Sequence, residues 1–466
     1  MFKSFAVEGV WFLPDTPNQQ VAGVLTFDND DGIFRPMLRL TGSPPPLSVP
    51  QPAFYPVVLG CQRGDGREVT LLECSGVTHL DNPLRLPESG LLTAETCLVG
   101  THFPSGDVRP TALAVHFVIL DEWARSTGLH IESEPGNFFA VTARYSPAEP
   151  IPLAAYGDET YSLHLYQSHS RGFRNFSINE RVYLVIEPKG EPKGMEHLVN
   201  LMFLLQQFLT LAADQAVSPE IIKITVLRGT EEQWPGGPLS EQADLFLPVH
   251  AYHAVAQPPS PYSLGFTMAS AGNRMGTILS SWLDKAKSLS AMRALYFAPM
   301  FNQKQYVDSS FLSLATAAES YHSGLSSGST KEPKNQFRVR KERILQAVDE
   351  ADREWLAEVL THANALTLRD RLTALVGESS LAAKMMLVDP ADITGSVARI
   401  VDTRNYLTHG GRKGKNVKDD PQSLYHMTRF LHVVLRECLL KEIGFSQDEA
   451  NGITGRLQYR EVKGKV

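Results

Sequence analysis

The stretch ADITGSVARIVDTRNYLTHGG, residues 391–411, has the pattern of one complete amphipathic helix. Asp392 or Thr394 can cap its N-terminus after Pro390, because both side chains accept hydrogen bonds from free backbone N–H groups. Gly410 predicts its end, since glycine readily adopts the backbone conformation that follows a helix. The apolar residues between these signals recur at helical spacing. A helical fold is therefore predicted for this part of the chain.

The same period extends outward from about residue 277 to Phe445. The other segments that show it are ILSSWLDKAKSLSAMRALYF, SSFLSLATAAESYHS, FRVRKERILQAVDEADREWLAEVL, LRDRLTALV and PQSLYHMTRFLHVVLRECLLKEIGF. Residues after Phe445 are polar and show no clear period. This half of the chain is predicted to be an all-α bundle.

The first 270 or so residues have a different pattern, with short β-rich runs separated by turn residues. Examples of these runs are VEGVWF, VAGVLTF, YPVVLGC, EVTLLEC, ALAVHFVIL and RVYLVIE. Clusters of proline lie between the runs, as expected of loops. One long helix is expected over 194–215. The fold class is therefore an α+β multidomain chain, in which a β-rich domain, sandwich-like with a packed helix, precedes the helical bundle.

These patterns predict four segments along the chain. Residues 1–275 are expected to form a β-rich domain with a sensing or regulatory role, and 276–300 a helical connector. Residues 301–446 are expected to form the helical bundle, and 447–466 a polar C-terminal tail.

Composition limits the classes of function. The net charge of −7 over 466 residues gives no whole-chain signature of nucleic-acid binding, so any RNA contact requires a local basic patch. The four cysteines form no CxxC pair, which argues against a thiolate metal site. No apolar run reaches membrane-spanning length, and the start of the chain lacks the apolar core of a signal peptide. We expect a soluble cytoplasmic protein that needs no cofactor or metal.

Three polar residues near the end of the 391–411 helix are the candidate functional group. Arg404 continues the apolar stripe of Val397 at i+7, where its charge requires an anion or other acceptors. Asn405 and His409 are four residues apart and share an adjacent face. The basic loop RKGKNVK at 412–418 follows directly and offers phosphate contacts.

Each of these features also has a structural interpretation. Histidine near a helix C-terminus is favoured by the helix dipole, and glycine after it is an ordinary cap. An arginine on a buried stripe often forms a structural salt bridge, and most charged runs are solvated loops. The spacing of arginine and histidine alone does not distinguish a functional role from a structural one, since Arg125 with His130 and Arg109 with His116 match the same short pattern.

VDTRNYLTHGG, followed by a loop and a long terminal helix, resembles the RNxxxH motif of HEPN domains, and most closely the ApeA type found in prokaryotic defence proteins. The resemblance covers about 300–445, where SSFLSLATAAESYHS is similar to the first helix of the family, with Glu319, and LRDRL to its middle segment. The N-terminal runs GVWFLP, VAGVLTF, VVLGC and VTLLEC are similar to the β-rich domain that precedes this type of HEPN domain.

The resemblance implies a metal-independent endoribonuclease in which two protomers form one cleft. His409 would be general acid or base, Arg404 would stabilise charge on the phosphate, and Asn405 would orient the phosphate or the histidine. The candidate RNA contacts are Arg412, Lys413, Lys415 and Lys418.

Several other charged residues near the motif are not assigned a catalytic role. Glu319, Arg369 and Arg371 could support the site or form bundle salt bridges, and we interpret them as the latter. His426, Arg429 and Arg436 lie roughly along one face of the last helix.

The expected partners are an RNA substrate and at least a second copy of the chain through the HEPN domain, with no membrane. The resemblance implies a toxin of abortive infection, held inactive until a phage protein reaches the N-terminal domain. The alternative is a non-catalytic HEPN dimerisation or binding module, with the N-terminal domain as a ligand or protein sensor.

Overall fold

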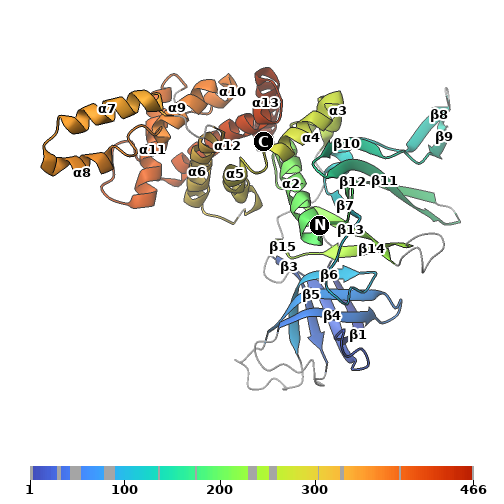
Figure 1. The fold of residues 1–466 in the computed structure, drawn as a ribbon. Coiled ribbons are helices and arrows are strands. Elements are labelled where there is room, and N and C mark those ends of the chain that lie inside the picture. The colour runs from blue at the N-terminus through green and yellow to red at the C-terminus, as the bar shows by residue number, and fades with distance from the viewer. Residues whose placement is uncertain are drawn as a thin grey trace. The chain divides into compact units, whose positions relative to one another are not determined.

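The computed structural model describes residues 4–28, 33–41, 54–77, 90–134, 137–173, 176–228, 239–250, 260–302, 304–325, 330–387 and 390–463 (Figure 1). The chain divides into two compact units, Met1–Ser280 and Ser281–Val466. The finer division into four segments stays a prediction.

The first part of unit 1 is a closed antiparallel barrel. Its strands are β1 (Phe5–Phe12), β2 (Val21–Asp28), β3 (Ile33–Leu40), β4 (Phe54–Gln62), β5 (Glu68–Val77) and β6 (Leu91–Val99). β3 pairs with β6 and β1 pairs with β4, which closes the ring of hydrogen bonds. Trp11 fills the barrel core, and Gly60 is required beside it because a Cβ at that position would overlap the indole ring.

The second part of unit 1 is an open antiparallel sheet that continues from the barrel. Its strand order is β10 (Ile151–Tyr156), β11 (Glu159–Arg171), β12 (Phe176–Pro188), β7 (Ala112–Phe117), β13 (Pro219–Arg228) and β14 (Leu239–Phe246). β14 also pairs with β6, so the sheet and the barrel share a hydrogen-bonded edge. The expected helix over 194–215 is confirmed as α2 (Met195–Ala213), which contacts β7 and buries Leu205 and Phe208.

Smaller elements complete unit 1. They are α1 (Leu120–Ala124), the hairpin β8 (Leu129–Glu134) and β9 (Asn137–Tyr145), β15 (Val249–His250), η1 (Pro261–Ser263), α3 (Met268–Ala271) and η2 (Gly272–Arg274). α4 (Met275–Asp284) spans the boundary between the units. The predicted β-rich fold with a packed helix is confirmed, and the structure refines the expected sandwich to a barrel joined to an open sheet.

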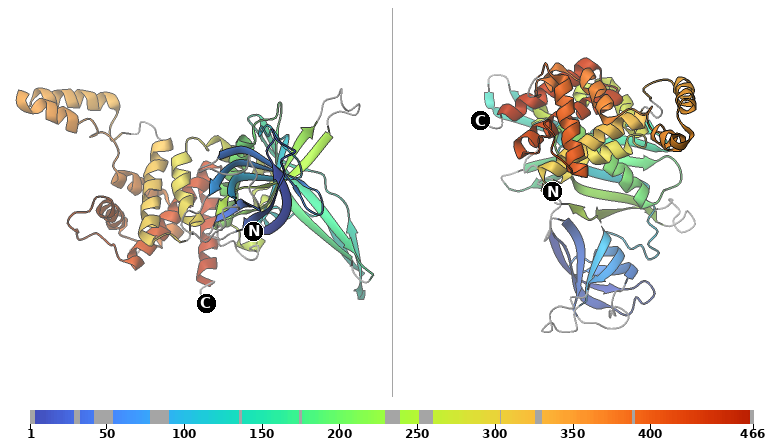
Figure 2. Two further views of the ribbon diagram at one scale, coloured as in Figure 1. Left: turned by 90° about the horizontal axis from the view of Figure 1, so that it is seen from below. Right: turned by 90° about the vertical axis from the view of Figure 1, so that its left-hand side faces the viewer.

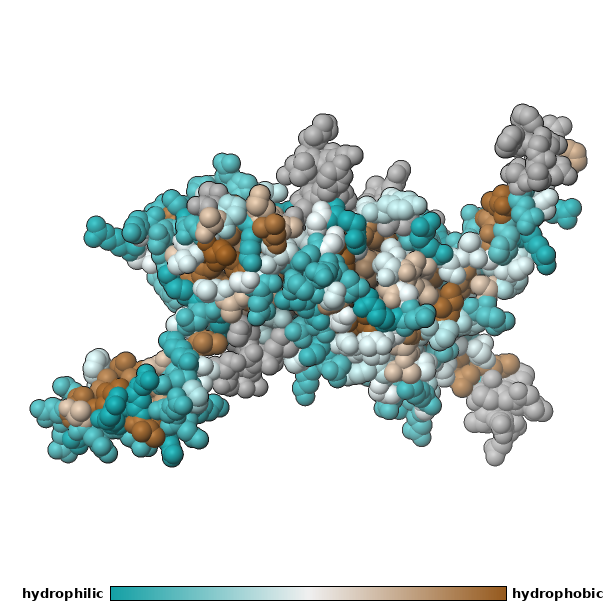
Figure 3. Space-filling model, turned by 90° about the horizontal axis from the view of Figure 1, so that it is seen from above, coloured by the Kyte–Doolittle hydropathy of each residue, from teal (hydrophilic) through white to brown (hydrophobic). Residues whose placement is uncertain are grey.

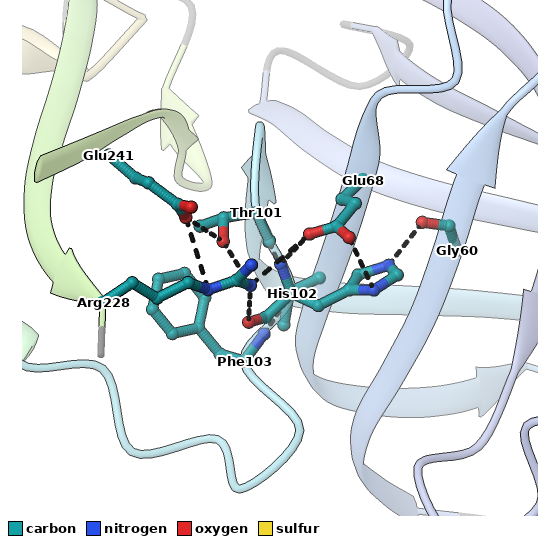
Figure 4. Close-up of polar contacts among 8 residues, drawn as sticks. Gly60, Glu68, Thr101, His102, Phe103, Arg228 and Glu241 are labelled. Carbon is teal, nitrogen blue, oxygen red and sulfur yellow. Dashed lines mark hydrogen bonds and ion pairs between the residues drawn. The ribbon is translucent and has the colours of Figure 1, made fainter. Parts of the chain in front are cut away.

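A polar network ties the barrel to the open sheet (Figure 4). Arg228, at the end of β13, donates to Thr101 Oγ1 at 2.8 Å and to the His102 carbonyl oxygen at 3.2 Å. Its guanidinium group also lies 3.3 Å from Glu241 on β14 and 3.5 Å from Glu68 on β5. Because one side chain joins four partners on three segments, Arg228 links the two parts of unit 1.

Replacing Arg228 by methionine is expected to lower the free energy of unfolding by about 1 kcal/mol, since the hydrogen bonds are lost but the carboxylates stay partly hydrated. Urea denaturation followed by tryptophan fluorescence measures the change. Arg63→Met is the matched control, because Arg63 forms one ion pair with Glu8 at 3.3 Å and both side chains are well exposed. Equal effects of the two substitutions would contradict the linking role.

Unit 2 is helical throughout its described regular structure, which confirms the predicted all-α bundle (Figures 1 and 2). Its helices are α5 (Ser290–Phe301), α6 (Val307–Leu325), α7 (Lys334–Gln346), α8 (Glu350–Val359), α9 (Leu368–Glu378), α10 (Leu381–Lys384), α11 (Ile393–His409), α12 (Pro421–Glu442) and α13 (Gln447–Lys463). α6 contacts α5, α9, α11 and α12, and its buried Phe311, Leu314 and Ala318 place it at the centre of the core.

The segment after Phe445, which shows no clear period in sequence, forms α13 and contacts α10 and α12. Ala450, Ile453 and Leu457 are buried and recur at i, i+3 and i+7. Most of the other residues of α13 are polar, so the helical period of its apolar residues is weak in the sequence. The expected polar tail over 447–466 thus includes a helix that the sequence pattern does not indicate.

α7 and α8 differ from the rest of unit 2, because neither helix has a buried residue. Val339, Trp355 and Val359 are exposed apolar side chains on this pair, and Figure 3 shows apolar surface among hydrophilic surface there. The core that positions α11 is thus formed by the other helices.

Within the described part of the chain, no helix has both the length and the hydropathy to cross a membrane.

Candidate functional site

α11 carries the candidate residues and is fixed at both ends. Asp392 Oδ1 accepts a hydrogen bond from the Gly395 backbone N–H at 2.8 Å, so Asp392 is the N-cap. The helix ends at His409, and Gly410 follows with a φ of 68°. Both helix signals of the sequence are therefore confirmed. The inward stripe is also confirmed, since Val397, Ile400 and Val401 are buried.

Arg404 lies at the edge of that buried stripe, with 21% of its side chain exposed. Its Nη2 is 3.2 Å from Glu319 Oε2 on α6, and its Nη1 donates to Asn405 Oδ1 at 3.2 Å. The anion that the charge of Arg404 requires on this buried stripe is thus the Glu319 carboxylate. A guanidinium group has more N–H donors than these two contacts use, so the geometry leaves Arg404 capacity for a further acceptor.

Two arginines of α9 hold the surroundings of Arg404 together. Arg371 Nη1 donates to the Glu319 carbonyl oxygen at 2.9 Å, which anchors α6 beside α9. Arg369 Nη2 is 3.3 Å from Asp402 Oδ1 on α11. The interpretation of Arg369 as a bundle salt bridge is confirmed. Glu319 also forms a salt bridge of the bundle, but its partner is the candidate residue Arg404 itself.

Asn405 and His409 are exposed at the end of α11. Their spacing of four residues places them on one face of the helix. Thr408 Oγ1 donates to the Arg404 carbonyl oxygen at 2.8 Å, which satisfies one backbone acceptor of the last turn. The structure thus brings Arg404 and Asn405 into contact and leaves the imidazole of His409 open to a ligand at the helix end.

The basic loop after α11 is anchored along the helix. Asn416 Nδ2 donates to Asp402 Oδ2 at 2.8 Å, and the Lys418 backbone N–H donates to Thr403 Oγ1 at 2.9 Å. Val417 between them is buried. The loop therefore returns beside the middle of α11, and its cations are held near the candidate site.

The four cations of this loop are not equivalent. All of them are exposed, but Lys413 Nζ is 2.6 Å from Asp419 Oδ1. This hydrogen bond raises the pKa of Lys413 and lowers the pKa of Asp419, so both groups stay charged and largely neutralise each other. Arg412, Lys415 and Lys418 carry no such ion pair among the described residues.

Sequence patterns missed the residues that anchor the loop, Asp402, Thr403 and Asn416. Their partners lie on different segments, so no local spacing identifies them. Among the residues that the structure describes, no group of three or more His, Cys, Asp or Glu side chains could hold a metal ion.

Two family models match the chain. Residues 6–282 match the ApeA N-terminal domain 1, and residues 312–449 match the Apea-like HEPN domain. The second match includes Glu319, the whole of α11 and the basic loop. Comparisons with curated proteins and with solved structures gave no match.

Proposed function

Because the chain belongs to the ApeA N-terminal domain 1 family and carries an Apea-like HEPN domain, we propose that it is a metal-independent endoribonuclease of anti-phage defence. One observation carries the proposal. Arg404 contacts Asn405 near the end of α11 and His409 is exposed at that end, beside a loop of anchored cations.

RNA supplies its own nucleophile, so cleavage requires only groups that transfer protons and a group that stabilises negative charge. The 2′-oxygen attacks phosphorus and forms the O2′–P bond while the P–O5′ bond breaks. His409 either takes the proton of the 2′-OH or gives a proton to the leaving 5′-oxygen. Arg404 stabilises the charge that develops on the phosphate oxygens, and Asn405 orients Arg404 through their hydrogen bond. The products are a 2′,3′-cyclic phosphate and a 5′-OH.

A second copy of the chain completes the site in this proposal. One His409 cannot be both base and acid in the same step, and a two-fold dimer brings two motifs to one cleft. A homodimer or higher homo-oligomer through the HEPN domain is therefore the proposed active form.

The test of this function is cleavage by the purified full chain without metal. The protein is incubated with total RNA in EDTA, alone and with lysate of phage-infected cells, and the 3′ ends of the products are identified by mass spectrometry. Cyclic phosphate ends in EDTA support the proposal. No cleavage under either condition, or cleavage that requires a divalent metal, overturns it.

The second candidate function is a non-catalytic HEPN binding module. The observation that favours it is the ion pair between Arg404 and Glu319, which gives the arginine a structural partner. In both cases we propose that the N-terminal domain senses the trigger, such as a phage protein. A groove of about 570 Å³ on the open sheet supports a sensing role, because Tyr166, Arg181, Tyr183 and Lys223 line it. Cleavage abolished by Arg404→Ala and His409→Ala excludes the non-catalytic alternative.

The unpaired cations of the basic loop are expected to contribute to RNA affinity through contacts with phosphates. Replacing Arg412 and Lys415 by alanine is expected to reduce the slope of log K against log salt by about 1.4, at about 0.7 for each single-strand phosphate contact. RNA binding is measured at several KCl concentrations in the His409→Ala background, which prevents cleavage. Lys413→Ala is the control with a smaller expected effect, because Asp419 already neutralises that lysine. An unchanged slope in the double variant would show that these two residues do not contact the RNA phosphates.

A further inference from the structure

A cavity of about 330 Å³ lies beside α11 in unit 2. Its apolar lining comes from three segments: Met386 and Leu387 after α10, Ile400 on α11, and Met427 and Phe430 on α12. The volume lies at the lower end of the range for small-ligand sites, about 300–1,000 Å³. Flexible methionine side chains and one aromatic ring can adapt to a flat, rigid ligand.

The ionisable lining of this cavity is mainly basic, and Ser396 and Ser423 add hydroxyl groups. Arg399, Lys418 and His426 all reach it, and Asp420 is its one acidic lining residue among the described part of the chain. Arg399 Nη2 donates to Ser396 Oγ at 2.8 Å, and its Nη1 is 3.7 Å from Asp392, so the guanidinium group is held in place with further donors remaining. His426 and Phe430 are four residues apart on α12 and therefore share one face, on which His426 is exposed and Phe430 is buried, so His426 provides the ring for stacking and Phe430 part of the apolar floor.

This cavity is linked to the candidate nuclease site through two elements. α11 lines it with Ile400 and ends at His409, about 13 Å further along the helix axis at about 1.5 Å per residue. Lys418 lines it from the end of the basic loop, where its backbone N–H is bonded to Thr403. The basic loop thus extends from the end of α11 to the cavity.

We propose that this cavity binds one nucleotide of the single-stranded RNA substrate, and so determines the base preference of cleavage. The inference rests on the proposed function. The base enters the apolar part and stacks on the exposed ring of His426, while Lys418 and Arg399 contact the phosphate of the same unit. The chemistry recognised is that of a nucleoside monophosphate, which occurs both in RNA and as a free nucleotide.

The first arm of the test measures nucleotide binding without cleavage. AMP, GMP, CMP and UMP are titrated separately into the full chain, and binding is followed by saturation-transfer NMR. At least one nucleotide is expected to bind, and Lys418→Met is expected to weaken it about tenfold or more. Lys334→Met is the matched control, because Lys334 is an exposed lysine of unit 2 on α7 and does not line the cavity. Lack of binding by all four nucleotides, or equal effects of the two substitutions, overturns the proposal.

The second arm distinguishes an RNA site from a site for free nucleotides. Ser423 lines the cavity and is only half-buried, so Ser423→Phe fills the space while the melting temperature reports whether the fold is kept. Cleavage sites of wild type and variant are mapped on an RNA pool of random sequence. A changed base preference near the cleaved bond supports the proposal, and an unchanged preference overturns it even if free nucleotides bind. Nucleotide binding without any ribonuclease activity would refute the proposed function and the role of the cavity in base preference, but not the nucleotide site itself.

Discussion

Replacing either Arg404 or His409 by alanine is expected to lower RNA cleavage about 10²- to 10⁴-fold. Loss of a general acid or base costs a factor in this range, and so does loss of a charged group that stabilises the transition state. The two effects are not expected to multiply in the double variant, because both residues act in one step. The measurement is the single-turnover rate on a defined single-stranded RNA under activating conditions in EDTA.

The controls for these substitutions come from the same unit. Arg340 is exposed and pairs with Glu332, and His362 is exposed outside α11, so Arg340→Ala and His362→Ala remove the same residue types far from the motif in sequence. Their rates are expected to match wild type, and all four variants are compared by thermal denaturation. A rate that survives both Arg404→Ala and His409→Ala would show that the proposed nuclease mechanism is wrong.

Helix and strand content could be predicted from sequence because both depend on local periodicity. α11 is the clearest case, since its cap, its buried stripe and its glycine stop all lie within one short segment. The closed barrel could not be predicted, because closure depends on the pairing of β3 with β6, which are far apart in sequence. α13 was missed for a different reason. Its buried stripe is narrow, and its helical period is weak without knowledge of the surface on which it packs.

The candidate site was partly predictable for the same physical reason. Val397 and Arg404 are seven residues apart, so their common face follows from helix geometry alone. The contact of Arg404 with Glu319 requires the crossing of α6 and α11, which no local pattern encodes. The hydrogen bond between Asp402 and Asn416, which anchors the basic loop, likewise depends on how the chain folds back and has no local sequence pattern. Sequence thus identified residues that share one helix, and the structure adds the partners that hold them.

Glu319→Ala is expected to lower the cleavage rate at saturating RNA about 10- to 100-fold with little change in KM. The Glu319 carboxylate is 3.2 Å from Arg404 Nη2, and it holds the guanidinium group at the edge of the helix face that carries Asn405. Without it Arg404 has more freedom, and a displacement of about 1 Å can reduce a rate about 100-fold. Steady-state kinetics separate the effect on the rate from the effect on RNA binding.

The conservative variant distinguishes positioning from charge. Glu319→Gln keeps the length of the side chain and one acceptor oxygen, so it is expected to recover most of the rate that Glu319→Ala loses. Glu378→Ala is the matched control, because Glu378 is an exposed carboxylate that pairs with Lys441 at 3.7 Å in the same unit. Increased cleavage in Glu319→Ala would mean that the carboxylate masks Arg404 from the phosphate. Glu319 would then hold the site inactive, because its negative charge would offset the positive charge of Arg404 and so weaken the stabilisation of charge on the phosphate.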